Sequence, residues 1–169
     1  MADECVLFTT NYAGTNELGR SVCLDGGDPY SGPYGNAWVG TYNRTNNRFY
    51  KINGLTGAID ATVELPAGVS PYGCAVDSQG ILWAPGGWHG AGRLAYFDTA
   101  NPSVAPVLLS EPFTSSNHFY GVCVDSEDSV WIGGWDTRDV FRYRPDRSGG
   151  WSTLANGPWT RVRASESNI

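Results

Sequence analysis

The chain has 169 residues, enough for a single domain with its own hydrophobic core. Hydrophobic residues make up 41% of it and charged residues only 17%, which excludes a disordered tail. The net charge is −6 with only 11 Lys and Arg, so neither nucleic acid nor an anionic membrane is an expected partner, because both are bound through basic surfaces.

The aromatic content of 7 Trp, 9 Tyr and 6 Phe favours strands, while 22 Gly and 10 Pro predict frequent turns. No segment sustains the 3.6-residue apolar period of a helix, so almost no helix is expected. The first expected strand is Cys5–Thr10. The residues before it lack the features of a secretory signal, and no apolar run reaches the ~20 residues of a membrane helix. We therefore expect a cytoplasmic protein, or a secreted one if a signal has been lost.

A repeat follows along the chain. The segments Tyr72–Trp83 and Tyr120–Trp131 align with each other. Their aspartates, at positions 77 and 125, are 48 residues apart, and their tryptophans are separated by the same 48 residues. A third copy lies upstream, with Asp25 as its aspartate and Trp38 as its tryptophan. The connection between these two residues is longer than in the other copies and is rich in Pro and Gly. The aspartates at positions 77 and 125 are expected to accept hydrogen bonds from nearby backbone amides in tight turns between two strands.

Each copy predicts four strands, which is typical of a β-propeller blade at this period. The first strands are apolar without alternation and should be buried on both faces. The third strands are expected at Arg48–Asn53, Arg93–Asp98 and Val140–Arg144, and the fourth at Ala58–Leu65, Val104–Leu109 and Trp151–Leu154. We therefore expect an all-β fold of three propeller blades at residues 19–68, 69–117 and 118–160, between an N-terminal segment at 1–18 and a C-terminal tail at 161–169.

The repeated segments, continuing into Arg93–Asp98 and Phe141–Pro145, resemble the blades of NHL, gluconolactonase-like and virginiamycin B lyase-like propellers. The resemblance covers about residues 20–155. It implies a superfamily that hosts many functions. The lyases use a histidine base with supporting Glu, His and a divalent metal, and the lactonases an axial metal held by Glu, Asn and Asp. A weaker similarity to tectonin-type lectins, through Val130–Trp131 and Phe141–Tyr143, implies sugar binding.

Three blades cannot close a propeller, which needs at least four. Two uncovered blade faces of about 800 Å² each would forfeit on the order of 20 kcal/mol. We therefore expect a homo-oligomer, with two copies forming a six-bladed ring and the strand Cys5–Thr10 joining the neighbouring chain. The alternative is a fragment of a longer propeller.

Ligand sites of propellers lie where the first strands begin and the loops between second and third strands open. The candidate ligand-binding residues at this face are Tyr42, Asn43, Tyr72, Trp88, His89, Asn117, His118, Tyr120, Trp135 and Asp136. The tryptophans at positions 88 and 135 each follow a Gly-Gly pair and either stack on a ligand or fill gaps between blades. The histidines at 89 and 118 are candidate catalytic bases, because the pKa of His lies near neutrality, or plain loop residues.

No metal site follows clearly from the sequence. Glu111 is the one glutamate expected near the candidate face, so the lyase set is incomplete, and a lactonase set of Glu111, Asn117 and Asp136 is a poor match. Asp25 and Asp28 could contact Ca²⁺, although a plain turn explains them as well. The cysteines at positions 23, 74 and 123 form no CxxC pair, so we expect small buried thiols instead of a zinc site.

These observations favour a binding or scaffold module that takes a small molecule, a sugar or a protein. The first alternative is a metal-assisted lyase or lactonase, for which the cofactor would be a divalent metal. The second is a carbohydrate-binding propeller. The Asn43–Thr45 glycosylation sequon has meaning only if the protein is secreted.

Overall fold

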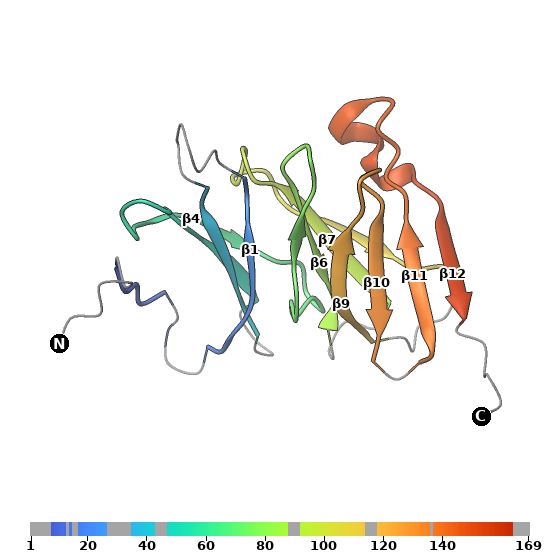
Figure 1. Cartoon of the computed structure of the whole chain (residues 1–169), viewed down its shortest axis with the longest axis horizontal. Helices are drawn as coiled ribbons and strands as arrows, with labels where there is room; N and C mark the ends of the chain where they lie inside the picture. Colours follow the sequence, from blue (N-terminus) through green and yellow to red (C-terminus); the bar gives the residue numbers. More distant parts are fainter. Residues whose placement is uncertain are drawn as a thin grey trace.

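The computed structural model describes residues 8–12, 14, 17–26, 35–42, 47–87, 92–113, 118–135 and 137–163. These residues form twelve strands in three four-stranded antiparallel sheets, each built from consecutive strands (Figure 1). Blade 1 comprises β1 (Gly19–Leu24), β2 (Ala37–Thr41), β3 (Arg48–Ile52) and β4 (Ile59–Glu64). Blade 2 comprises β5 (Ala75–Val76), β6 (Ile81–Pro85), β7 (Arg93–Asp98) and β8 (Val107–Ser110). Blade 3 comprises β9 (Phe119–Val124), β10 (Val130–Gly134), β11 (Asp139–Tyr143) and β12 (Trp159–Arg163).

The all-β fold of three four-stranded blades is therefore confirmed. The first strands lie next to one another, because β5 contacts both β1 and β9. The blades consequently diverge from a shared inner edge, with blades 1 and 3 at the two ends of the molecule (Figure 1). In the described part of the chain, no helix has the length and apolar character needed to cross a membrane.

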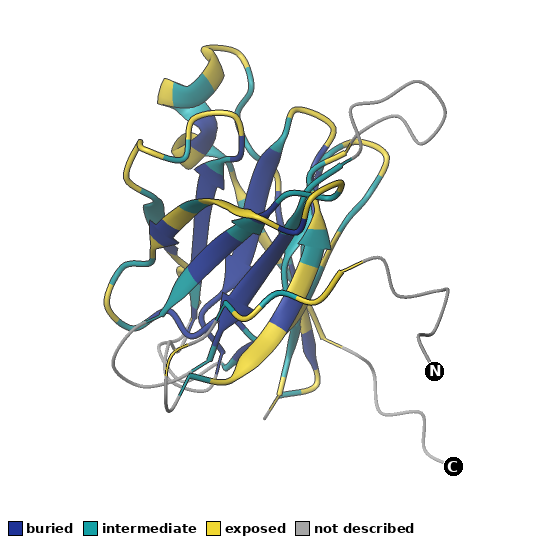
Figure 2. Ribbon diagram, turned by 90° about the vertical axis from the view of Figure 1, so that its left-hand side faces the viewer, coloured by how far each residue is buried: buried dark blue, intermediate teal, exposed yellow. Residues whose placement is uncertain are grey.

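The hydrophobic core fills the two spaces between neighbouring blades, where dark blue strands run through the middle of Figure 2. Between blades 1 and 2, Trp38 packs its ring edge on Phe97 with 5.1 Å between ring centroids. Between blades 2 and 3, Trp83 meets Tyr143 at 5.9 Å. The repeated tryptophan of one blade therefore packs against the next blade along the chain.

An aspartate fixes the first hairpin of every blade. Its carboxylate accepts a hydrogen bond from the indole N–H of the repeated tryptophan in the same blade. The donor–acceptor pairs are Trp38 and Asp25 at 3.1 Å, Trp83 and Asp77 at 2.9 Å, and Trp131 and Asp125 at 2.7 Å. The carboxylates also accept bonds from backbone amides across the turn, as the sequence predicted for positions 77 and 125. The repeat is thus a hydrogen-bonded structural unit.

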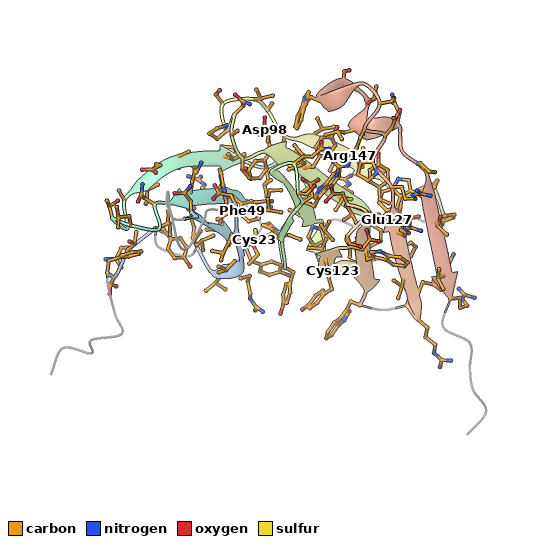
Figure 3. The ribbon with its side chains drawn as sticks, turned by 45° about the horizontal axis from the view of Figure 1, so that its top comes forward. Cys23, Phe49, Asp98, Cys123, Glu127 and Arg147 are labelled. Carbon is orange, nitrogen blue, oxygen red and sulfur yellow. A yellow bond between two sulfur atoms is a disulfide. The ribbon has the colours of Figure 1, made fainter. Side chains whose placement is uncertain are left out.

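Polar contacts also join blades 2 and 3 at the turns. Asp128 has a φ of 58°, and its carboxylate accepts bonds from the backbone N–H of Ser78 at 2.9 Å and from its hydroxyl at 2.5 Å. Arg147, which lies above blade 3 in Figure 3, donates to the buried Asp77 at 2.6 Å. The turns of neighbouring blades are therefore held together by charged hydrogen bonds.

The expectation of small buried thiols is wrong for all three cysteines. Cys23 of β1 and Cys74, just before β5, form a disulfide with 5.8 Å between their Cα atoms. The first strands of adjacent blades lie side by side, and these two side chains point toward each other across the gap. Cys123 of β9 is a free thiol and is exposed, so it is not buried either.

The fourth strand expected at Trp151–Leu154 is also wrong. Residues Gly150–Asn156 form a 3-10 helix, η2, and the fourth strand is β12. Hydroxyls support the helical turns, since Thr153 donates to the Asp146 carbonyl at 2.7 Å and Ser152 donates to the Gly149 carbonyl at 3.0 Å. These local bonds compete with strand pairing, and the chain returns to the sheet only after Pro158.

The first strands are not buried on both faces, contrary to expectation. In blade 1, Val22 and Leu24 are each 65% exposed, because no blade among the described residues covers this face of β1. Part of the N-terminal segment instead lies along the outer strands of blade 1, where Thr10 donates to the Gly57 carbonyl at 2.6 Å. Residues 5–7 of the expected strand Cys5–Thr10 lie outside the described residues, and its pairing with a neighbouring chain stays a prediction.

Candidate functional site

Four aromatic side chains from the three blades form a continuous row, which we call the aromatic row: Tyr42, Tyr72, Tyr120 and Trp135. All four are among the residues that the sequence placed at the ligand face. The row follows from repeat positions. Tyr72 and Tyr120 each lie five residues before the repeated aspartate, where the first strand is entered. Tyr42 and Trp135 each lie four residues after the repeated tryptophan, where the second strand ends.

Antiparallel pairing brings these two kinds of position to the same edge of the blades. Gly19 at the start of β1 pairs with Thr41 at the end of β2, and Phe119 at the start of β9 pairs with Gly134 at the end of β10. The adjacent first strands then place the three blades in succession along this edge, which we call the entry edge. Loop residues far apart in sequence therefore become neighbours.

Each ring of the aromatic row contacts the next. Tyr42 meets Tyr72 edge-on at 5.3 Å between centroids, and Tyr72 stacks on Tyr120 at 3.7 Å. Tyr120 in turn contacts Trp135 at 4.6 Å. The three tyrosines are half-buried, while Trp135 is 58% exposed, so the row ends in an indole that faces solvent. Such contacts order the rings, since each pair contributes about 0.5–1.5 kcal/mol beyond area burial.

Arg20 lies at the other end of the row and is a residue that sequence reasoning missed. Its guanidinium lies 4.7 Å from the centroid of Tyr72 and 5.3 Å from that of Tyr42, and it donates a hydrogen bond to the Tyr72 hydroxyl. The signal was present in the sequence, because Arg20 precedes Asp25 by the same five residues that separate Tyr72 from Asp77. The row therefore combines ring faces with one cation.

The hydroxyl of Tyr120 remains protonated at neutral pH. Burial and the neighbouring Tyr72 hydroxyl raise the pKa of Tyr120 to about 12. At Tyr120 the row therefore offers a neutral O–H group beside ring faces, which suits ligands that combine apolar faces with hydroxyl groups.

Of the two candidate catalytic bases, only His118 lies among the described residues. His118 precedes β9 at the entry edge, and its carbonyl accepts the backbone N–H of Trp135 at 2.9 Å, so it lies beside the row. Glu111 is buried and accepts the backbone N–H of Phe113 at 2.5 Å. The remaining predicted residues lie outside the described residues; these are Asn43, Trp88, His89, Asn117, Asp136 and Asp28.

The opposite edge, which carries the aspartate turns, contains a groove of about 450 Å³ lined by Leu24, Asp25, Gly26, Val76, Asp77, Ser78 and Gly80. The two carboxylates in it already have protein partners. Asp25 pairs with Lys51 at 3.4 Å and accepts a hydrogen bond from the Asn36 backbone N–H at 2.7 Å, and Asp77 pairs with Arg147. The suggested Ca²⁺ role of Asp25 thus gains no support.

No group of three His, Cys, Asp or Glu side chains suited to holding a metal ion occurs among the described residues.

Comparison with known proteins adds the fold alone. No family model matches the chain, and no curated protein matches it. Among solved structures, the crystal structure of a protein from Lactobacillus plantarum is similar, with a TM-score of 0.61 at 11% identity over 87% of this chain. The matched region spans 42% of that longer chain. The similarity therefore supports the arrangement of the three blades and carries no activity.

Proposed function

We propose that this chain is a binding module of the propeller type and that the aromatic row, with Arg20, is its contact surface. The observation that supports this is the unbroken succession of ring contacts from Tyr42 to Trp135 across all three blades. A row that ends in a largely exposed indole holds rigid apolar area in contact with solvent. Aromatic residues of this kind are enriched in binding surfaces because they provide contact area at a low cost in side-chain entropy.

Neutral oligosaccharides are the ligand class that the row favours. Sugar rings present flat apolar faces bordered by hydroxyls, which match ring faces bordered by the Tyr72 hydroxyl and the Arg20 guanidinium. The net charge of −6 disfavours strongly anionic polymers. Trp135 supplies the most accessible stacking face, so the carbohydrate-binding alternative has a specific observation behind it.

The lyase or lactonase alternative draws no comparable support from the described residues. His118 lies near the row, but His89, the other candidate base, is outside the described residues. A binding function therefore remains the better proposal.

The compartment that we propose is oxidising. The bond between Cys23 and Cys74 joins two blades, and structural disulfides are typical of secreted proteins. This supports the secreted alternative, in which the sequon at Asn43 would also have a meaning.

The test measures binding of cellohexaose, chitohexaose and laminarihexaose by calorimetry to the wild type and three variants. Trp135→Ala and Tyr120→Ala should weaken binding of the preferred sugar by about tenfold or more, because each removes a ring worth about 1–2 kcal/mol of contact. Leu55→Ala is the matched control, since Leu55 is 67% exposed in the turn between β3 and β4 at the opposite edge. Affinities unchanged in both row variants would show that the row is not the contact surface. No binding of the wild type to any of these sugars would refute the carbohydrate assignment.

A further inference from the structure

Equivalent residues of every blade lie on the face that points along the chain toward a following blade. The strand registers identify four such residues in each blade, which form two cross-strand pairs. The pairs are Cys23 with Trp38 and Phe49 with Val63 in blade 1, Ala75 with Trp83 and Leu94 with Leu109 in blade 2, and Cys123 with Trp131 and Val140 with Val162 in blade 3. Blade 3 therefore carries the same type of interface as the two blades before it.

The burial of these positions differs sharply between the blades. Phe49 and Leu94 are both fully buried against the next blade. The equivalent Val140 is 40% exposed, and Val162 is 49% exposed. Cys123 is a free, exposed thiol, whereas the equivalent Cys23 is bonded to blade 2. Blade 3 thus presents an interface that nothing in the described chain covers.

Blade 1 has the complementary open face. Val22 and Leu24 lie three and one residues before Asp25. The same positions in blade 2 are Cys74 and Val76, which pack against blade 1. The valines at these positions in blade 3, 122 and 124, likewise pack against blade 2. In blade 1, the positions that contact the preceding blade in blades 2 and 3 are therefore exposed.

The described residues of the N-terminal segment cover only the outer part of this face. Tyr12 packs on Tyr50 of β3 with 5.8 Å between centroids, and Glu17 accepts a hydrogen bond from the Tyr50 hydroxyl at 3.2 Å. The inner strand β1 stays exposed at Val22 and Leu24. Figure 2, which views the molecule from the side of blade 1, shows exposed segments on this side in yellow. Because radial blades diverge with distance from the axis, another blade could reach β1 while residues 8–12 lie between the outer strands.

We propose that a second copy of this chain docks its blade 1 on blade 3 of the first, and that the reverse contact closes a six-bladed ring of two chains. The interface continues the two blade contacts already present in the chain, and it covers both open faces at once. In it, Cys123 of one copy lies against Val22 of the other, in the geometry that Cys23 and Cys74 adopt within the chain.

The same docking extends the aromatic row. Arg20 occupies in blade 1 the position of Tyr72 and Tyr120, and Tyr42 occupies the position of Trp135. Within the chain, Tyr42 contacts Tyr72 of the following blade. By the same geometry, Trp135 meets Arg20 of the second copy, so the rows of both copies join into one ring around the axis.

The decisive experiment is a disulfide between copies. All variants carry Cys5→Ser, so that Cys123 is the remaining unpaired thiol. In this background Val22→Cys should convert most of the chain to a covalent dimer on non-reducing gels, because the new pair repeats a disulfide that the chain already forms. Val104→Cys is the matched control; it is an exposed valine, 45% accessible, that lies between β7 and β8 and outside both faces. Val22→Cys combined with Cys123→Ser should not crosslink.

Light scattering on the wild type gives the second measurement. The expected mass is twice the 18.2 kDa of one chain. Val140→Asp and Val162→Asp should shift dissociation to a concentration about tenfold higher or more, with unchanged circular dichroism, because both side chains are already exposed in the single chain. A wild-type monomer at micromolar concentration, or crosslinking of Val22→Cys no greater than that of Val104→Cys, would overturn the proposal. A ladder of covalent oligomers would overturn the closed ring.

Discussion

The disulfide between Cys23 and Cys74 should supply a large share of the stability that joins blades 1 and 2. The two residues are 51 positions apart in the sequence. Closing a loop of that length removes denatured-chain entropy worth about 4 kcal/mol at 25 °C in the chain-entropy model. Whole domains of ordinary stability unfold with about 5–15 kcal/mol, so replacing both cysteines with serine should leave a much weaker fold.

Urea unfolding followed by tryptophan fluorescence measures this effect. For an m-value near 2 kcal/mol/M, the midpoint should fall by about 2 M in the Cys23→Ser/Cys74→Ser variant. A thiol reductant should lower the wild-type midpoint by a similar amount and leave the double variant unchanged. Cys123→Ser is the control and should keep the wild-type midpoint, because Cys123 is a free thiol. A double variant with the wild-type midpoint would show that the blades are held by packing alone.

Two further predictions concern the turns and acid stability. Asp128→Ala should destabilise the protein by about 1–2 kcal/mol in urea unfolding, because it removes both hydrogen bonds to Ser78. Asp128→Asn should destabilise it less, because asparagine keeps an acceptor and tolerates the positive φ. Equal losses of stability in the two variants would contradict this. Hydrogen bonds from the Trp131 indole and the Ser129 amide lower the pKa of Asp125 below 3.8, and those from Arg163 and Arg161 lower the pKa of Asp139. Their stabilisation is therefore complete above about pH 4 and is lost as pH falls toward the folded-state pKa values. The urea midpoint should drop as the pH falls below about 4, and the drop should be smaller in Asp125→Asn.

The blades were predictable because their determinants are local. An aspartate that binds the amides of its own turn and the indole six residues later leaves a fixed spacing in the sequence, as at Asp77 and Trp83. The third strand of blade 2, Arg93–Asp98, was predicted with its observed bounds, since it is a short apolar run that ends at a turn. Periodicity and turn chemistry therefore determine the sheets of this fold.

The errors come from features that spacing does not encode. The pattern at Trp151–Leu154 is apolar enough for a strand, but hydroxyl bonds to the backbone before it favour helical turns. The disulfide depends on which face of each first strand a cysteine occupies. Cys23 lies two residues before its aspartate and Cys74 three, so on alternating strands they face opposite ways and meet between the blades. This one-residue difference is visible in the sequence. It predicts a disulfide only when the two first strands are known to lie side by side in space.

The aromatic row depends on a glycine as much as on its rings. Gly87 occupies in blade 2 the position held by Tyr42 in blade 1 and Trp135 in blade 3. Its φ is +63°, and a Cβ atom there would lie 2.1 Å from the Ser70 carbonyl oxygen, so neither the backbone nor the space admits a side chain. Blade 2 consequently contributes one ring to the row, where blade 3 contributes two. Tyr72 is therefore free to contact Tyr42 on one side and Tyr120 on the other, and this is why the row passes from blade 1 to blade 3 without a break.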